Sequence, residues 1–467
     1  MRGKIKWIIC LDGTSNSERL IDTSLTNVSL LRQCISTNYI ARNEGETDAR
    51  QVTSYHDGIG TGFKNPLNVV QQAFGDGIDR IILDAYHYLC QNYREGDEIF
   101  LIGFSRGAYA ARCIADLVDQ RGLLENSGRD KVQEVYEAWT RDPPSNRTDE
   151  RPIPEGHRPI IKACALWDTV GSIGTPIRKG ILGRRFKFVH SELPPNVEHV
   201  VQALSLHEHR YHFSPVVVHP TRKDRDQRTR MDEPTIEQCW FAGYHADIGG
   251  GCKKDALAHF ALVWMITKLK KEWLDLNTDH LYNDNNMPIT WTVGDHCGIR
   301  LQNSTRRLPV IDSMSAGFMT GGSKYRVPKM EFWNDDGPYT NPGTILDSEE
   351  KIHATARFLS QCKLVKLFKC ADGNMPQKVT VDSGSWQWSL HSEIESRWNL
   401  HSRLPRQNIV HENPLTKDEE TILERWANRD HWVFDRGTYN AGAGAPNTVL
   451  VWLQTWLKNS RETADPE

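Results

Sequence analysis

Long hydrophobic runs are missing from this sequence. The longest unbroken apolar stretch covers only residues 260–266, whereas a helix that crosses a bilayer needs roughly 20 apolar residues. Only a few residues precede the first apolar segment, which begins at Trp7, so there is no room for a secretory signal. We therefore expect a protein made in the cytoplasm without a membrane span, and any export would need a route that uses no signal peptide.

An excess of either charge is also absent. Lysine and arginine number 57 against 60 aspartates and glutamates, so the molecule as a whole is not built to bind nucleic acid. The ten cysteines are scattered, and several of them, such as Cys10, Cys113 and Cys164, fall inside periodic apolar segments. That placement suits reduced, buried thiols better than a disulfide framework.

Apolar strand patterns alternate with helical periodicity over the first 270 residues. This alternation predicts an α/β fold with a doubly wound, mainly parallel sheet, in which ligands bind at the carboxyl ends of the strands. The expected helices include residues 25–40 and 78–93. The expected strands are residues 6–11, 52–55, 98–102, 160–167, 215–218 and 238–242.

The alternation of strand and helix patterns becomes irregular from about residue 289, and nine of the fifteen tryptophans follow residue 290. Because disordered tails are poor in aromatic residues, we predict a packed module here. The expected organisation is an α/β-hydrolase-like catalytic domain over residues 1–288 and a Trp-rich accessory or cap module over residues 289–467.

Two insertions interrupt the predicted catalytic domain. Residues 176–198 carry basic side chains, among them Arg184, Arg185 and Lys187, interleaved with apolar ones. This insertion is either a lid that meets an anionic lipid surface or a solvated loop. Residues 219–234 are dense in arginine and aspartate and are interpreted as an exposed linker.

The most informative motif is Gly103-Phe-Ser105-Arg-Gly107. A short apolar run leads into it, and small residues at helical spacing follow. This layout is typical of a nucleophile elbow, a strained strand-to-helix turn that exposes a serine oxygen. Glycine is expected at both Gly103 and Gly107 because a side chain there would collide with the neighbouring strand or helix. The alternative is an ordinary serine in a Gly-rich turn.

An elbow serine needs a base, and the base needs an acid that fixes its tautomer. In α/β-hydrolases the acid follows the serine in the chain and the histidine comes last. Asp168 and His245 fit that order, and each follows a predicted strand. Two alternatives stay open: Asp168 could close an Asx turn, and Asp247 could take the place of the acid instead of shaping its own loop.

The remaining loops at this edge supply candidates for the rest of the site. The oxyanion of an acyl-transfer intermediate needs two backbone donors. We expect them to be the amides of Arg106 and Thr14, with Gly13 permitting close approach. Asp12 and Asp57, like Asp247, belong to the predicted rim. No cofactor is required by this chemistry.

A histidine cluster offers a competing interpretation. His207, His209 and His212 have spacing that could suit zinc. The neighbouring Glu208 and Arg210 indicate instead a polar network beneath the site. The rim aspartates could also bind a hard metal ion, which would make this a metal-dependent phosphoesterase, although that interpretation leaves the elbow unexplained.

Six ordered motifs begin at Leu11, Tyr55, Gly103, Trp167, Ala203 and Phe241. Together they resemble a known family. The resemblance covers about residues 3–270, and it is to the α/β-hydrolase catalytic domain shared by the first class of bacterial type VI secretion phospholipase effectors and by many fungal proteins of similar length. It implies a triad of Ser105, Asp168 and His245, and phospholipase A activity in the bacterial members. His207 stands where the resemblance implies an acidic residue.

The sequence therefore predicts a serine hydrolase that cleaves carboxylic esters through an acyl-enzyme, with a phospholipase-like or lipase-like specificity. The expected substrate is an acyl ester or phospholipid, and residues 176–198 could contact a membrane surface. The serine mechanism needs no metal, no nucleic acid is expected as a partner, and the sequence does not say which protein partners the chain has. Two alternatives remain: a metal-dependent phosphoesterase, and a catalytically silent binding module with the same fold.

Overall fold

The computed structural model describes most of the first 279 residues and parts of the remainder. The described residues are 3–13, 25–42, 46–58, 76–124, 129–141, 156–171, 189, 193–210, 213–219, 234–251, 257–279, 326, 328, 349–356, 378–382, 385–389 and 409–428. Every structural statement below concerns these residues.

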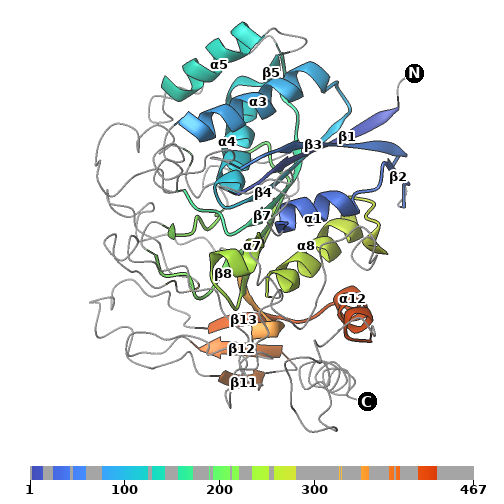
Figure 1. The fold of residues 1–467 in the computed structure, drawn as a ribbon, viewed down its shortest axis with the longest axis vertical. Coiled ribbons are helices and arrows are strands. Elements are labelled where there is room, and N and C mark those ends of the chain that lie inside the picture. Colours follow the sequence, from blue (N-terminus) through green and yellow to red (C-terminus); the bar gives the residue numbers. More distant parts are fainter. Residues whose placement is uncertain are drawn as a thin grey trace, which may run out of the picture.

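A single large sheet runs through the described part of the chain (Figure 1). Its strand order is β11-β12-β13-β10-β9-β8-β7-β4-β1-β3-β2. All neighbours from β3 to β13 are parallel, and antiparallel strands lie only at the two edges. The strands are β1 (Lys4–Leu11), β2 (Asn38–Tyr39), β3 (Ala49–His56), β4 (Glu98–Phe104), β7 (Ile161–Trp167), β8 (His199–Ser205), β9 (Thr235–Phe241), β10 (Glu350–His353), β11 (Lys378–Asp382), β12 (Ser385–Ser389) and β13 (Ile409–Asn413). A separate small sheet pairs β5 (Leu123–Leu124) with β6 (Gly156–His157).

Helices cover both faces of the sheet, as a doubly wound fold requires (Figure 1). One face carries α3 (Asp76–Asn92), α4 (Arg106–Arg121) and α5 (Arg129–Arg141). The other carries α1 (Asn27–Cys34), α7 (His245–Gly249), α8 (Ala258–Glu272) and α12 (Lys417–Asn428). The strands serve both faces by alternation: in β1, Ile8 and Cys10 enter one hydrophobic core, and Ile9 and Leu11 enter the other.

The order of the central strands determines where a site can form. The chain passes from β1 to its neighbour β3, then returns to β4 on the other side of β1 and continues outward through β7, β8 and β9. In open α/β sheets, ligands bind where the strand order reverses in this way, which here is at the carboxyl ends of β1 and β4. Leu11 and Gly103 are register partners at that end, so the loop after β1 lies beside the elbow after β4.

Most expected strands and helices are present, but the strand expected at residues 215–218 is wrong. Pro215 forms only an isolated bridge with Val170, and proline cannot donate to a central ladder. The strand after β7 is instead β8, whose apolar run is interrupted by the buried Gln202. The helix expected over residues 25–40 ends at Cys34, because Ile35 enters a bridge with Leu276 and β2 follows.

The C-terminal half continues the same sheet, since β10 pairs with β9 and β13 pairs with β10. Buried polar contacts join it to the first half: Trp240 Nε1 donates to Glu350 Oε2 at 2.8 Å. Within the second half, His353 Nε2 of β10 contacts Glu419 Oε1 of α12 at 3.0 Å, and both side chains are buried. The division at residue 288 and the role of a Trp-rich module stay predictions.

The described residues agree with the expectation of reduced, buried thiols. Six cysteines there are free and buried. No helix in the same part of the chain is long and apolar enough to cross a membrane.

Candidate active site

Ser105 occupies a strained turn between β4 and α4. Its φ of 58° and ψ of −122° lie in a region that residues with side chains rarely adopt, at a cost of order 1–3 kcal/mol. Glycine on both sides makes the turn feasible. A Cβ on Gly103 would lie 2.7 Å from the Ala108 backbone, and one on Gly107 would lie 2.2 Å from the Leu11 carbonyl oxygen.

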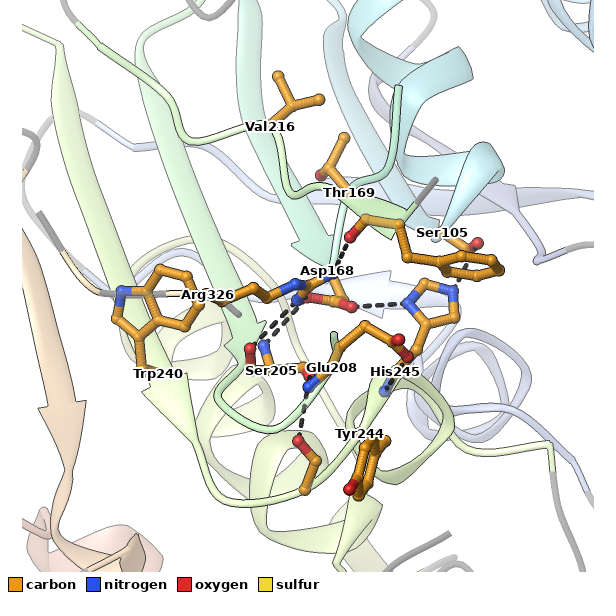
Figure 2. A network of polar contacts seen from close by, with 12 residues as sticks. Ser105, Asp168, Thr169, Ser205, Glu208, Val216, Trp240, Tyr244, His245 and Arg326 are labelled. Atoms are coloured by element: carbon orange, nitrogen blue, oxygen red, sulfur yellow. Dashed lines mark hydrogen bonds and ion pairs between the residues drawn. The ribbon is translucent and has the colours of Figure 1, made fainter. Parts of the chain in front are cut away.

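The structure brings Ser105, His245 and Asp168 together from three strand ends (Figure 2). Ser105 Oγ lies 2.7 Å from His245 Nε2, and His245 Nδ1 lies 2.6 Å from Asp168 Oδ2. Because a carboxylate only accepts, Nδ1 carries the ring proton and Nε2 is left to accept from the serine hydroxyl. All three side chains are buried, and Asp168 has no exposed surface.

Asp168 is held from several sides. It follows β7 with a positive φ of 43°. Its Oδ1 accepts from the Ser205 amide at 3.0 Å and from Arg326 Nη1 at 2.5 Å. Burial alone would raise the pKa of this carboxyl, but the charge of Arg326 and the hydrogen bond from His245 lower the pKa of Asp168 to about 2. The carboxyl is therefore ionised throughout the neutral range.

The imidazole of His245 has an apolar and aromatic surrounding. The rings of Phe104 and Phe213 lie 4.8 Å and 5.0 Å from it, between centroids. Burial lowers the pKa of His245 below its ordinary value, although the hydrogen bond and charge of Asp168 oppose that effect. The ring is consequently neutral at pH 7 and able to accept a proton.

A buried ion pair lies beneath the imidazole, where the sequence indicated a polar network. Glu208 Oε1 accepts from Arg210 Nε at 2.9 Å, and its Oε2 accepts from Arg210 Nη2 at 2.8 Å. The Arg210 guanidinium also covers the Phe213 ring at 3.4 Å. Burial disfavours the Glu208 carboxylate, yet its hydrogen bond and attraction to Arg210 keep the Glu208 pKa lowered.

Two other acids stand outside the Ser105–His245–Asp168 chain of contacts. Asp247 Oδ2 accepts from the Tyr244 amide at 2.9 Å, so this side chain shapes the first turn of α7. Its Cβ also packs against Gly243, which has a φ of 132°. Asp57 follows β3, which is separated from β4 by β1.

Asp12 organises the loop that follows β1. Its Oδ1 accepts from the Gly13 amide at 2.6 Å, and its Oδ2 accepts from Tyr55 at 2.5 Å and Thr26 at 2.8 Å. Burial raises the pKa of Asp12 to about 6, against the lowering effect of these hydrogen bonds. Thr14, the second expected oxyanion donor, lies outside the described residues.

The histidine cluster does not converge on one point. His207 Nδ1 accepts from the Gly243 amide at 2.7 Å, and His209 Nδ1 donates to the His207 carbonyl oxygen at 3.1 Å. His212 is outside the described residues. Among the residues that the structure describes, no three His, Cys, Asp or Glu side chains are grouped to hold a metal ion. At position 207, where the resemblance implies an acidic residue, the histidine ring accepts a hydrogen bond from the Gly243 amide, as a carboxylate would.

Most of the two predicted insertions falls outside the described residues. These are residues 176–188 and 190–192 in the first, including Arg184, Arg185 and Lys187, and residues 220–233 in the second. The sequence offered no indication of Arg326, which lies in the irregular second half and belongs to no motif.

In this parallel sheet, β4 ends at a strained serine whose hydroxyl contacts a histidine ring. This arrangement defines the class of α/β-hydrolase-like domains. Within that class, the chain belongs to the family described as T6SS, phospholipase effector Tle1-like, catalytic domain, whose model matches residues 6–268. This is a family of lipase- and phospholipase-like hydrolase domains, as the resemblance of the motifs implied.

Individual relatives cover only part of the chain. The uncharacterized protein YEL023C of Saccharomyces cerevisiae is 27% identical over 238 residues, which are 46% of this chain and 32% of that protein. The chain thus spans about a third of the length of that curated relative.

Two solved structures are similar at 17% sequence identity. The Tle1 effector bound to the VgrG spike from the type 6 secretion system has a TM-score of 0.34, with 55% of this chain and 53% of that chain covered. An uncharacterized protein from Pseudomonas aeruginosa has a TM-score of 0.35, with 58% and 46% covered.

The packing of the elbow leads to a first prediction. Gly107→Ala places a methyl group against the carbonyl oxygens of Leu11 and Asp12, so the loop after β1 must move. We expect a loss of about 1–3 kcal/mol in the free energy of unfolding, together with a loss of esterase activity. Urea denaturation and turnover measure the two effects.

Gly3→Ala is the matched control, because nothing lies within 4 Å of a Cβ at that position. It should change stability by less than about 0.5 kcal/mol. An alanine at position 107 that is as stable and active as the wild type would contradict the close packing.

Proposed function

We propose that this chain is a serine hydrolase that cleaves carboxylic esters, with Ser105 as the nucleophile, His245 as the general base and Asp168 as the acid of a catalytic triad. The observation that supports this most directly is the unbroken chain of contacts from Ser105 Oγ through the imidazole to the Asp168 carboxylate. Family membership supports hydrolase chemistry independently.

In the proposed reaction, Ser105 Oγ attacks the ester carbonyl while His245 Nε2 takes the serine proton. The resulting imidazolium is stabilised by Asp168, whose low pKa keeps it ionised. The imidazolium then gives its proton to the leaving alcohol, and an acyl-enzyme remains. Water, activated by the same imidazole, attacks the acyl group and restores the free serine.

The oxyanion that develops on the carbonyl needs donors on the side of Ser105 away from the base. The amide of Arg106 begins α4, where the helix dipole also favours negative charge. The second proposed donor, the Thr14 amide, is supported by proximity: the preceding residues Leu11 and Asp12 pack directly on Gly107. Asp12 would hold this loop in shape through its bond to the Gly13 amide.

For the substrate, we propose a phospholipid cleaved at an acyl ester, as in a phospholipase A. The support is the description of the family, which names phospholipase effectors. The phenylalanine rings beside His245 also make the surroundings of the reacting atoms apolar, and the basic, apolar composition of residues 176–198 fits contact with a lipid surface.

The nucleophile is tested by Ser105→Ala. We expect labelling by a fluorophosphonate probe to disappear and kcat to fall by roughly 10⁴ to 10⁶, as when other triads lose a member. The variant should keep its fold, because the hydroxyl is the only group removed. Ser54→Ala, on β3, serves as the control and should be labelled like the wild type. Undiminished turnover in Ser105→Ala would refute the serine mechanism.

The lipid specificity is tested with a short-chain phosphatidylcholine, below and above the concentration at which it forms micelles. If the enzyme acts at a lipid surface, the rate of fatty acid release per enzyme molecule should rise by several-fold once micelles form. Equal rates on monomeric and aggregated lipid would leave a hydrolase of soluble esters as the better description.

The identity of the acid is tested by Asp168→Asn, compared with Asp247→Asn. An amide at position 168 would leave Nδ1 of His245 without its acceptor and favour the wrong tautomer, so kcat should fall by roughly 10⁴. Asp247 contacts the Tyr244 amide rather than the imidazole, so its replacement should affect stability more than turnover. A larger kcat loss in Asp247→Asn would show that the acid has been assigned wrongly.

A further inference from the structure

The carboxylate of Asp168 is shared between two positively charged or chargeable groups. Its Oδ2 faces His245, and its Oδ1 faces the guanidinium of Arg326 at 2.5 Å. Figure 2 shows the imidazole and the guanidinium on opposite sides of the carboxylate. Arg326 lies beyond residue 268, where the family match ends, so this contact comes from outside the segment that the family model covers.

The guanidinium is fixed by more than one bond. Its Nη1 also donates to the Ser205 carbonyl oxygen at 3.1 Å, and its Nη2 donates to the Phe213 carbonyl oxygen. Only 4% of Arg326 is exposed. Since the Phe213 ring packs edge-on against His245, one side chain connects the proposed triad acid with a residue that packs on the imidazole.

We propose that Arg326 is a positioning residue of the triad: it holds the Asp168 carboxylate with one oxygen directed at His245 and offsets its charge, so that the imidazole stays neutral until it receives the serine proton. The proposal rests on the function proposed above. It gives the second half of the chain a defined part in the chemistry of the first.

The physical reason is the balance of charge among buried side chains. A buried carboxylate that faces only an imidazole favours the imidazolium, and so raises the pKa of the base. Arg326 competes for the same carboxylate and weakens that effect. The other charged groups facing His245 are Glu208 and Arg210, which form a bidentate pair with no net charge. Removing the positive charge at position 326 should therefore change the pKa of His245 without an opposing effect from the Glu208–Arg210 pair.

The direction of the effect on pH dependence follows. The base works when neutral, so kcat/KM falls as the pH drops through the pKa of His245. In the wild type this pKa is lowered by burial, so the acid limb should lie below about 6.5, the ordinary imidazole value. Loss of the Arg326 charge raises the pKa of the base and moves that limb to higher pH.

The test uses the full chain, a monomeric p-nitrophenyl ester and three variants. Arg326→Gln should move the acid limb of kcat/KM upward by about one pH unit and lower the plateau of kcat by roughly ten-fold, because the carboxylate loses a fixed donor. Arg326→Lys keeps the charge and loses the planar fork, so its limb should stay at the wild-type pH while kcat falls. Glu419→Gln disrupts a buried pair of the same half of the chain that does not touch the triad, and it should leave the limb in place.

An Arg326→Gln limb at the wild-type pH, or an equal displacement in Glu419→Gln, would overturn the proposal and make Arg326 a purely structural residue. If the glutamine variant fails to fold, the lysine variant decides, because a displaced limb there is incompatible with a role through charge. A failure of the triad itself is distinguishable, since Ser105→Ala would then remain active.

Discussion

The rest of the site depends on one constraint: the Asp168 carboxylate is fully buried, so protein groups alone must satisfy its charge. Each of its partners comes from a different part of the fold. The Ser205 amide ends β8, His245 follows β9, and Arg326 belongs to the C-terminal half. A misplaced β8 or β9 would leave a buried charge unpaired, at a cost of several kcal/mol. The acid therefore couples the chemistry of the site to the assembly of the sheet.

Polar residues inside the sheet serve the same purpose. Gln202 of β8 donates to Gln238 of β9 and to the Val216 carbonyl oxygen, and it accepts from the Thr169 hydroxyl. Thr169 directly follows Asp168, whose positive φ would not persist without such support. Ser105, the other non-glycine residue of the site with a positive φ, is supported in a different way, by close backbone packing at Gly103 and Gly107. Both strained residues are thus held by their surroundings, one by hydrogen bonds and one by sterics.

The elbow turn at Ser105 and the approach of Asp168 and His245 to it could be predicted from the sequence because each depends on local rules. Two glycines flank the serine, and side chains that follow parallel strands meet at one edge. The strand β8 could not be predicted because Gln202 interrupts its apolar pattern. The buried amide of Gln202 is satisfied by Gln238 of β9, a partner that the sequence does not reveal. Arg326 could not be predicted at all: it lies 158 residues from Asp168 in the chain, and an isolated arginine in irregular sequence has no pattern that distinguishes it from a solvated one. The role of Asp12 in its loop could not be predicted either, because it depends on where Thr26 and Tyr55 lie in space.

The position of β10 explains how the second half of the chain can reach the site. Because β10 pairs directly with β9, the C-terminal half is anchored to the strand whose carboxyl end leads to His245. The buried bond from Trp240 to Glu350 strengthens that anchorage two residues before the loop begins at Ala242. Arg326 itself is held by the carbonyl oxygens of Ser205 and Phe213, so it loses little further conformational freedom on meeting the carboxylate, which is the condition under which a buried ion pair is favourable. The residues 6–268 that match the family contain Ser105, Asp168 and His245, whereas the ion pair that offsets the buried charge of Asp168 uses Arg326, which lies beyond them.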